Sequence, residues 1–317
     1  MNSRIAIVDM GTNTFHLLLA DIHEDGSKII LRDRLAVKIG KGGINQGRIT
    51  EAAMNRALVA MQSFRNTIDK HGITDIYAFG TSAFRNATNR DEIAKRINDL
   101  TGIEVHIISG DEEAMYIYEG VKAALGLGDE RSLIIDIGGG SVEFIIANAN
   151  EVFWMKSLET GAQRLLERYH QNDPITKQEI EELDQHFEKE LAPVFEALKK
   201  FPTSIMVGSS GTFDTLSDIF CAQHEIIKTP EEVETPLSLE GFYEIYEQLL
   251  VRDRDQRLAI PGMIEMRVDM IVVAGCLIRY LLQHHTFNRI RVSTYSLKEG
   301  VLAYMVRTRL QQSREAS

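Results

Sequence analysis

The sequence predicts a mixed α/β fold made of two similar halves that face each other across a cleft. The first observation is an internal repeat, because DMGTNTFHLLLA at residues 9–20 matches DIGGGSVEFIIA at residues 136–147 without a gap. The second is that apolar runs of strand length alternate with longer segments of helical spacing, as in mixed α/β sheets. The third is the length of 317 residues, which is enough for about two domains.

Each copy of the repeat predicts a β-hairpin with a polar turn. An apolar run, IAIV or LII, precedes Asp9 and Asp136, and turn residues such as Gly, Thr, Asn and Ser follow. One Asp-Gly turn between apolar runs is most simply a hairpin, but hairpin statistics do not explain the matching register or the equivalence of Thr14 and Ser141. Such turns align several backbone N–H groups, and Asp oxygens suit Mg²⁺. The repeat therefore indicates a cleft that binds phosphate and metal.

Composition and charge narrow the class of protein. A net charge of −11 disfavours non-specific binding to nucleic acid or membranes. The two cysteines, Cys221 and Cys276, lie far apart, which argues against a disulfide framework and suits a reducing cytosol. The N-terminus lacks a signal-peptide pattern, and the longest apolar run, residues 270–278, is too short to span a bilayer. We therefore expect a cytoplasmic protein without nucleic-acid or membrane partners, and the sequence leaves its oligomeric state open.

In the first half, further strands and helices follow the hairpin. Ser109 and Glu112 have the spacing of a capping box, so Glu113 is expected in the first turn of a helix that runs to Leu125. The other expected elements are a polar turn at 23–28, a strand at 28–40, a helix from Thr50 to Gly72, a strand at 75–80, a helix at 90–100 and a strand at 104–109.

In the second half, a helix is expected to open at Thr176 with Glu179 as its capping partner, and to break at Pro193. The remaining expected elements are a strand, turn and helix start at 204–213, an irregular and mobile stretch at 225–237 with Pro230 and Pro236, a buried helix at 268–284, a strand at 289–293 and a final helix from Leu297 to Gln311.

With these elements placed, the chain resembles the exopolyphosphatase and guanosine-pentaphosphate phosphohydrolase (Ppx/GppA) family. This family lies within the actin-like, sugar-kinase and heat-shock ATPase superfamily. The resemblance implies two ribonuclease-H-like (actin-like ATPase) domains, one formed by residues 1–125 with the C-terminal helix 298–317, the other by residues 126–297. The matching segments, in the family's order, are DMGTNTFHLLL (9–19), TSAFRNATN (81–89), SGDEEAMYIYEGV (109–121), DIGGGSVE (136–143), GSSGTF (208–213), RVDMIVVAG (267–275) and YSLKEGVL (295–302).

The resemblance implies hydrolysis of terminal phosphoanhydride bonds, with release of inorganic phosphate from polyphosphate, guanosine pentaphosphate or both. Glu113 matches the carboxylate taken as general base, which would orient water in line with the leaving oxygen. The start of a helix favours the ionised form of such a group. Without the resemblance, Glu113 is most simply a first-turn glutamate that complements the helix dipole.

Arg85 matches the family's phosphate-binding arginine, whose planar fork suits phosphate oxygens. The alternative is a surface arginine at a helix start, which we disfavour because cations are unfavourable there. Lys38 falls where many relatives carry a basic residue. His16 falls where relatives vary between His and Arg, and both a cleft-facing and a packed strand histidine stay open.

The acids and glycines of the repeat complete the implied site. Asp136 would bind Mg²⁺, Glu143 would position the metal or the water, and Asp9 is the matching acid of the first motif. Phosphate oxygens would be bound by the two turns and by a third turn that borders the adenosine site in nucleotide-using relatives. These phosphate-binding residues are Thr12, Asn13 and Thr14, then Gly138, Gly139, Gly140 and Ser141, and finally Gly208, Ser209 and Gly211.

Two other functions are alternatives to the hydrolase. One is an ATP-dependent small-molecule kinase of the same superfamily, and the other is a non-catalytic sensor of polyphosphate or of the guanosine alarmone. The segment around Glu113 matches the hydrolase, and the presence of Asp136 and Glu143 argues against the sensor. Longer family members continue into a further helical module, whereas this chain ends soon after the last helix, so we expect it to grip fewer phosphates.

Overall fold

The structure, a computed structural model, describes residues 3–23, 26–229 and 231–315. Part of the predicted turn at 23–28 and Pro230 of the predicted irregular stretch lie outside these residues. The chain divides into two compact units, which are described separately below. Unit 1 is Met1–Ala123 with Leu297–Ser317, and unit 2 is Ala124–Ser296.

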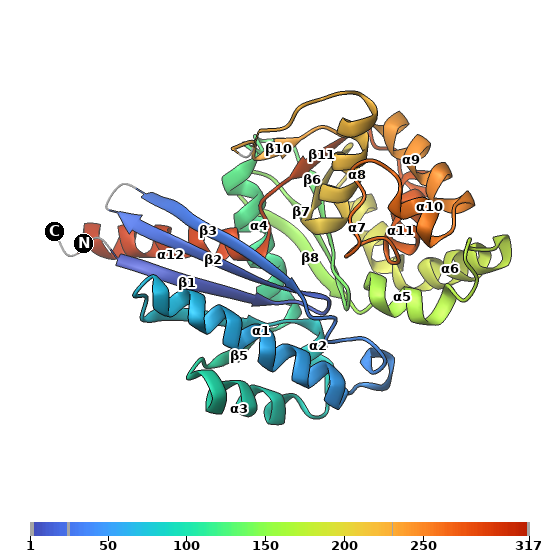
Figure 1. The fold of residues 1–317 in the computed structure, drawn as a ribbon. Helices are drawn as coiled ribbons and strands as arrows, with labels where there is room; N and C mark the ends of the chain where they lie inside the picture. Colours follow the sequence, from blue (N-terminus) through green and yellow to red (C-terminus); the bar gives the residue numbers. More distant parts are fainter. Residues whose placement is uncertain (1–2, 24–25, 230, 316–317) are drawn as a thin grey trace. The chain divides into compact units, whose positions relative to one another are not determined.

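Unit 1 is built on a five-stranded mixed sheet with the strand order β3-β2-β1-β4-β5 (Figure 1). The predicted hairpin forms the antiparallel pair β1 and β2, β3 extends it as a meander, and β4 and β5 add in parallel beside β1. The strands are β1 Ser3–Met10, β2 Thr14–His23, β3 Gly26–Ala36, β4 Asp75–Gly80 and β5 Val105–Ile107.

The core of unit 1 lies between its sheet and the long helix α1. Thr50 caps α1 by accepting a hydrogen bond from the Ala53 N–H at 3.3 Å, as predicted. Met54 and Phe64 of α1 are buried in one cluster with Val8 and other apolar residues of β1 and β2. Helix α12 contacts β1, β2 and β3. The helices are α1 Glu51–Lys70, α2 Ser82–Asn86, α3 Arg90–Thr101, α4 Gly110–Ala124 and α12 Leu297–Glu315, with a 3-10 turn at Ile44–Gln46.

Helices α4 and α12 pack at very close range. A Cβ atom added to Gly300 would come within 1.7 Å of the Tyr116 carbonyl oxygen, so only glycine permits this approach. Arg307 of α12 also donates to the Glu119 carboxylate of α4, at 2.7 and 2.6 Å. Both contacts hold α4, the helix that carries Glu113, against the rest of unit 1.

Unit 2 repeats the same strand order around a six-stranded mixed sheet, β10-β11-β9-β6-β7-β8. Strands β6, β7 and β8 form an antiparallel meander, and β9 and β11 add in parallel beside β6. Strand β6 thus corresponds to β1, and the predicted mixed α/β fold with two like-folded halves is confirmed. The strands are β6 Ser132–Ile137, β7 Val142–Ala147, β8 Val152–Leu158, β9 Ile205–Ser209, β10 Glu234–Thr235 and β11 Arg289–Ser293.

In unit 2 the buried helix α11 packs against α5, α6 and α9 (Figure 1). The capping box of Thr176 and Glu179 forms as predicted, and the break falls between α6 and α7, with Pro193 in the first turn of α7. The helices are α5 Ala162–Tyr169, α6 Lys177–Glu190, α7 Ala192–Lys200, α8 Ser210–Gln223, α9 Leu239–Val251, α10 Arg254–Leu258 and α11 Ile271–His284.

The structure contains elements that the sequence analysis missed. They are strand β8, helices α2, α5, α9 and α10, and the short strand β10, which lies in the stretch 225–237 expected to be irregular. Helix α5 is short, and its N-cap residue, Gly161, makes no side-chain capping bond, so it lacks a local start signal. The predicted helix at 268–284 begins only at Ile271, because hydrogen-bonded turns precede it. Within the described residues, no helix combines the length and the apolar character needed to cross a membrane.

Candidate active site

In unit 1 the predicted site residues follow three parallel strands that end together. Met10 at the end of β1 pairs with Gly80 of β4, which in turn pairs with Ile107 of β5. The segments that follow these strands carry the first polar turn, Arg85 and Glu113. Ligands of open α/β sheets bind beyond the carboxyl ends of parallel strands. We call this set the first half-site: Asp9, Thr12, Asn13, Thr14, Arg85 and Glu113.

Arg85 and Glu113 form an ion pair within the first half-site. The Arg85 Nη1 lies 2.9 Å from Glu113 Oε2 and also donates to the Ile108 carbonyl at 3.1 Å. The two side chains are 17% and 10% exposed. The predicted capping box forms, because Ser109 N–H donates to the Glu112 carboxylate at 2.8 Å, and Glu113 therefore lies in the first turn of α4. A charge-assisted hydrogen bond thus orients the candidate base.

The disfavoured alternative for Arg85, a surface arginine at a helix start, does not describe its position. Arg85 lies in the last turn of the short helix α2, where a cation is favourable. The helix position therefore does not favour a functional role for Arg85. The contact with Glu113 favours such a role. The segment 40–49 holds α2 from one side, since Thr88 N–H donates to the Gly47 carbonyl at 2.8 Å and Ile49 N–H donates to Asn89 Oδ1 at 3.0 Å.

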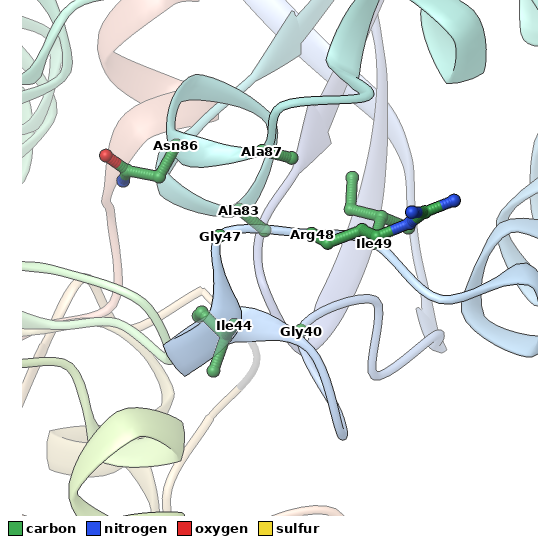
Figure 2. Close-up of a pocket in the computed structure, with 8 residues that line it drawn as sticks. All are labelled: Gly40, Ile44, Gly47, Arg48, Ile49, Ala83, Asn86 and Ala87. Carbon is green, nitrogen blue, oxygen red and sulfur yellow. The ribbon is translucent and has the colours of Figure 1, made fainter.

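A small gap remains between segment 40–49 and α2, and Figure 2 shows the residues around it. Its volume is about 10 Å³, which is at most the room of one water molecule. The gap is therefore a packing feature that supports α2, and it is too small for a phosphate chain. Its lining residues are Gly40, Ile44, Gly47, Arg48, Ile49, Ala83, Asn86 and Ala87.

The two turns of the repeat share one local structure. Gly11 N–H donates to the Thr14 carbonyl at 3.1 Å, and Gly138 N–H donates to the Ser141 carbonyl at 3.0 Å. The strand registers also match between the two hairpins. In each hairpin, the Asp at the end of the first strand lies opposite the same position of the second strand. Asp9 pairs with His16, and Asp136 pairs with Glu143. His16 therefore occupies the position that Glu143 has in unit 2.

The carbonyl groups of both turns are held by a following segment. In unit 1, N–H groups of Lys38 and Gly40 donate to the carbonyls of Asn13 and Thr12, at 2.8 and 3.0 Å. Lys38 adopts a left-handed backbone conformation, with φ of 49°, to make this contact. The backbone of Lys38 thus has a supporting role in the first half-site, whatever its side chain does.

In unit 2, the start of α5 holds the equivalent carbonyls. The Gly161 N–H donates to the Gly140 carbonyl at 3.2 Å. The next two N–H groups, of Ala162 and Gln163, donate to the carbonyls of Gly138 at 2.9 Å and of Gly139 at 2.8 Å. In a planar trans peptide the next N–H points away from the carbonyl. The N–H groups of Gly139, Gly140 and Ser141 therefore face the other side, and the described part of the chain offers them no backbone acceptor. Successive N–H groups on one side of a turn are the geometry of a nest, which suits an anion.

Asp136 and Glu143 are two buried carboxylates directly opposite each other on β6 and β7. Their residues are 5% and 1% exposed. Ser157 donates to Glu143 Oε1 at 2.7 Å, and Ser209 donates to Asp136 Oδ2 at 3.4 Å. Like charges directly opposite in a sheet are destabilising, so a cation beside both groups would stabilise their ionised forms.

This pair of carboxylates fits a Mg²⁺ ion that takes few of its ligands from the protein. Magnesium is commonly held by one or two carboxylates, with water and substrate phosphates as its other ligands. Among the residues that the structure describes, no three His, Cys, Asp or Glu side chains gather in a metal-binding arrangement. Asp9 belongs to the other unit, where its cross-strand partner is His16 rather than a second carboxylate.

The third predicted turn lies beside Asp136. Ser209 is the register partner of Asp136 on the parallel strand β9. A Cβ on Gly208 would come within 2.0 Å of the Phe213 ring, so close packing by itself accounts for that glycine. A Cβ on Gly211 would come within 2.2 Å of the Arg267 guanidinium, which the sequence analysis did not single out. We call Asp136, Glu143, the turn 138–141, Ser209 and Gly211 the second half-site.

The sequence analysis missed residues that contact the turns of the second half-site. Gly161 and Gln163 belong to the start of α5, a helix that was not predicted. Their only local signal is a Gly-Ala pair that follows an apolar run, TGA at 160–162. Arg267 has a clearer signal, because it begins the segment 267–275 that resembles the family.

Two units that share one strand order, each with a polar turn after its first strand, define the actin-like fold with two domains. The sequence matches the Ppx/GppA phosphatase family over residues 18–309, and the chain belongs to this family.

Solved structures and curated relatives agree with this assignment. An exopolyphosphatase from Cytophaga hutchinsonii is 44% identical, with a TM-score of 0.94, and the match covers 96% of this chain and 98% of that chain. A Ppx/GppA family member from Aquifex aeolicus is 24% identical, with a TM-score of 0.80 over 98% and 99% of the two chains, and shares the fold. A guanosine-5'-triphosphate,3'-diphosphate pyrophosphatase of Vibrio vulnificus is 28% identical over 97% of this chain, which spans 60% of that relative's length.

Proposed function

We propose that this protein hydrolyses the terminal phosphoanhydride bond of polyphosphate and releases one inorganic phosphate per cycle. The similarity to the Cytophaga exopolyphosphatase extends over nearly all of both chains, which supports polyphosphate as the first substrate to test. Guanosine pentaphosphate is the second, because a relative named for that type of nucleotide matches 97% of this chain. The reducing cytosol is the proposed compartment, where Cys221 and Cys276, both buried, would stay thiols.

The observation that carries the proposal is the 2.9 Å contact between Arg85 and Glu113. The Arg85 fork would bind oxygens of the terminal phosphate, and the Glu113 carboxylate would accept a hydrogen bond from the attacking water. The water oxygen would form a bond to phosphorus and pass a proton to Glu113 while the bridging P–O bond breaks, and the shortened chain would leave with the electron pair. Glu113 would then release the proton to solvent or to the phosphate product. One contact thus joins substrate binding to the positioning of water.

The second half-site would complete the neutralisation of charge. The N–H groups of Gly139, Gly140 and Ser141 would donate to phosphate oxygens. Asp136 and Glu143 would hold Mg²⁺, and bound magnesium neutralises phosphate charge as it develops. Each half-site would supply local groups of this kind, since a net charge of −11 requires local cationic and N–H groups to bind a polyanion.

The test is steady-state phosphate release from medium-chain polyphosphate and from guanosine pentaphosphate, each with and without Mg²⁺. We expect metal-dependent release and a larger kcat/KM for polyphosphate. Release from neither substrate, in spite of tight binding, would refute the hydrolase and favour a sensor.

The role of Glu113 is tested with Glu113→Gln. This change should lower kcat by at least about 100-fold while substrate binding is retained, because general-base assistance is typically of that size. Asp111→Asn is a matched control, since Asp111 is an exposed acid in the same turn of α4. Equal losses of binding and turnover in Glu113→Gln would contradict the assigned role.

A further inference from the structure

We propose that Arg164 is a positioning residue that sets the direction and donor strength of the Ser141 N–H in the second half-site. The inference rests on the proposed function only in that the turn 138–141 binds phosphate. The proposal assigns a role to a side chain of α5, a helix that was not predicted from the sequence.

Arg164 connects this turn to the rest of unit 2. Its Nε donates to the Gly140 carbonyl at 2.8 Å, and its Nη2 donates to Glu159 Oε2 at 2.9 Å. The Arg164 side chain is 13% exposed, whereas that of Glu159 is 39% exposed. The Gly140 carbonyl accepts a second bond from the Gly161 N–H at 3.2 Å. Both lone pairs of this carbonyl are therefore engaged.

The Gly140 carbonyl and the Ser141 N–H belong to one peptide group. Because that group is planar and trans, fixing the carbonyl direction also fixes the N–H, which points the opposite way. A guanidinium bonded to the carbonyl also polarises the peptide, and hydrogen bonds in such chains strengthen one another. Arg164 thus makes the Ser141 N–H a better oriented and stronger donor to an anion on the far side.

In unit 1, backbone groups hold the corresponding carbonyls. The carbonyls of Thr12 and Asn13 are held by backbone N–H groups of Gly40 and Lys38. Arg56 donates to the Val37 and Lys38 carbonyls, both at 2.7 Å, and so supports the segment whose N–H groups hold the turn. In the second half-site, a charged side chain adds directly to the backbone donors, because Arg164 bonds the Gly140 carbonyl.

The test compares Arg164→Gln, Arg164→Lys and the wild-type protein. The control is Arg168→Gln, because Arg168 lies one turn further along α5, where its guanidinium stacks on Tyr169. Two measurements are made on the full chain with Mg²⁺. They are hydrogen exchange of the amides of residues 139–141, and calorimetric binding of methylenediphosphonate, a non-hydrolysable phosphoanhydride analogue. Neither readout requires turnover, so the result is independent of whether the proposed hydrolysis occurs.

In Arg164→Gln we expect exchange of these amides, measured with the analogue bound, to rise about tenfold and the Kd for the analogue to rise about tenfold, as for loss of one charge-assisted hydrogen bond. Arg164→Lys should recover part of both effects, since an ammonium donates but lacks the fork. Arg168→Gln should match the wild type. Unchanged exchange and Kd in Arg164→Gln would overturn the proposal, and so would changes that merely follow a fall in Tm of the whole protein.

Discussion

Arg85 and Glu113 are 28 positions apart in the chain, and they meet at 2.9 Å beyond the carboxyl edge of the unit 1 sheet. Arg85 follows β4 and Glu113 follows β5, so the parallel pairing of these strands brings the two side chains together. The proposed phosphate-binding group therefore also orients the proposed base. A change at Arg85 should affect both binding and the chemical step.

Two replacements of Arg85 distinguish the effect of its positive charge from that of its planar guanidinium. Arg85→Gln should lower kcat/KM for polyphosphate by at least about 100-fold, as for loss of a preorganised charge-stabilising donor. Arg85→Lys should retain part of the binding but lose kcat, because an ammonium cannot bridge phosphate and Glu113 with a planar fork. Arg48→Gln is a control, since Arg48 is exposed at the edge of the small gap beside α2. Equal kinetics for Arg85→Lys and the wild type would argue against a shared role.

Gly161 sets how closely α5 approaches the turn of the second half-site. A Cβ at this position would come within 2.4 Å of the Gly140 carbonyl carbon. Gly161→Ala should therefore raise KM and lower stability by about 2 kcal/mol, as in other overpacked sites. Gly126→Ala adds the same methyl group where nothing lies within 4 Å, and it should leave both quantities unchanged. Chemical denaturation and steady-state kinetics measure the two effects, and an unaffected Gly161→Ala would show that the turn adapts.

The buried acid pair of β6 and β7 predicts opposite effects on stability and activity. Without Mg²⁺, Asp136→Asn should stabilise the protein by about 1 kcal/mol, because it removes a like-charge contact with Glu143. The same variant should lose its stabilisation by added Mg²⁺ and most of its phosphate release. Thermal unfolding with EDTA or with Mg²⁺ gives the comparison. A lower Tm of Asp136→Asn in EDTA would contradict the idea that these carboxylates repel.

Glu179, which belongs to neither half-site, makes the unfolding free energy depend on pH. Burial alone raises the pKa of this carboxyl group, but hydrogen bonds from the Thr176 and Asn172 N–H groups, among others, lower it from 4.5 to about 2. A lowered pKa in the folded state means that this stabilisation is fully present above about pH 4.5 and is lost as the pH falls towards 2. Glu179→Gln should cost about 2 kcal/mol at pH 7, the order expected for loss of charged hydrogen bonds. Its unfolding free energy should also depend less on pH between about 4.5 and 2, as urea titrations at several pH values would show.

Local patterns in the chain were sufficient for several features of the fold. The repeat predicted both hairpins with their turns, and the register of Asp136 with Glu143 follows from the turn length. The spacing of Ser109 and Glu112 placed Glu113 in a first helical turn, because capping depends on neighbours three residues away. The same reasoning failed for α2, since a helix of five residues owes its limits to its surroundings.

Only the tertiary structure decided which of these elements meet. The contact of Arg85 with Glu113, the position of Ser209 beside Asp136, and the bond from Arg164 to Gly140 all join segments that are distant in the chain. Parallel pairing of β4 with β5 and of β6 with β9 creates the first two, and the docking of α5 creates the third. Such contacts depend on burial and strand order, for which one sequence carries no local signal. The chemistry of the site was therefore readable in the residues, but its geometry was set by packing.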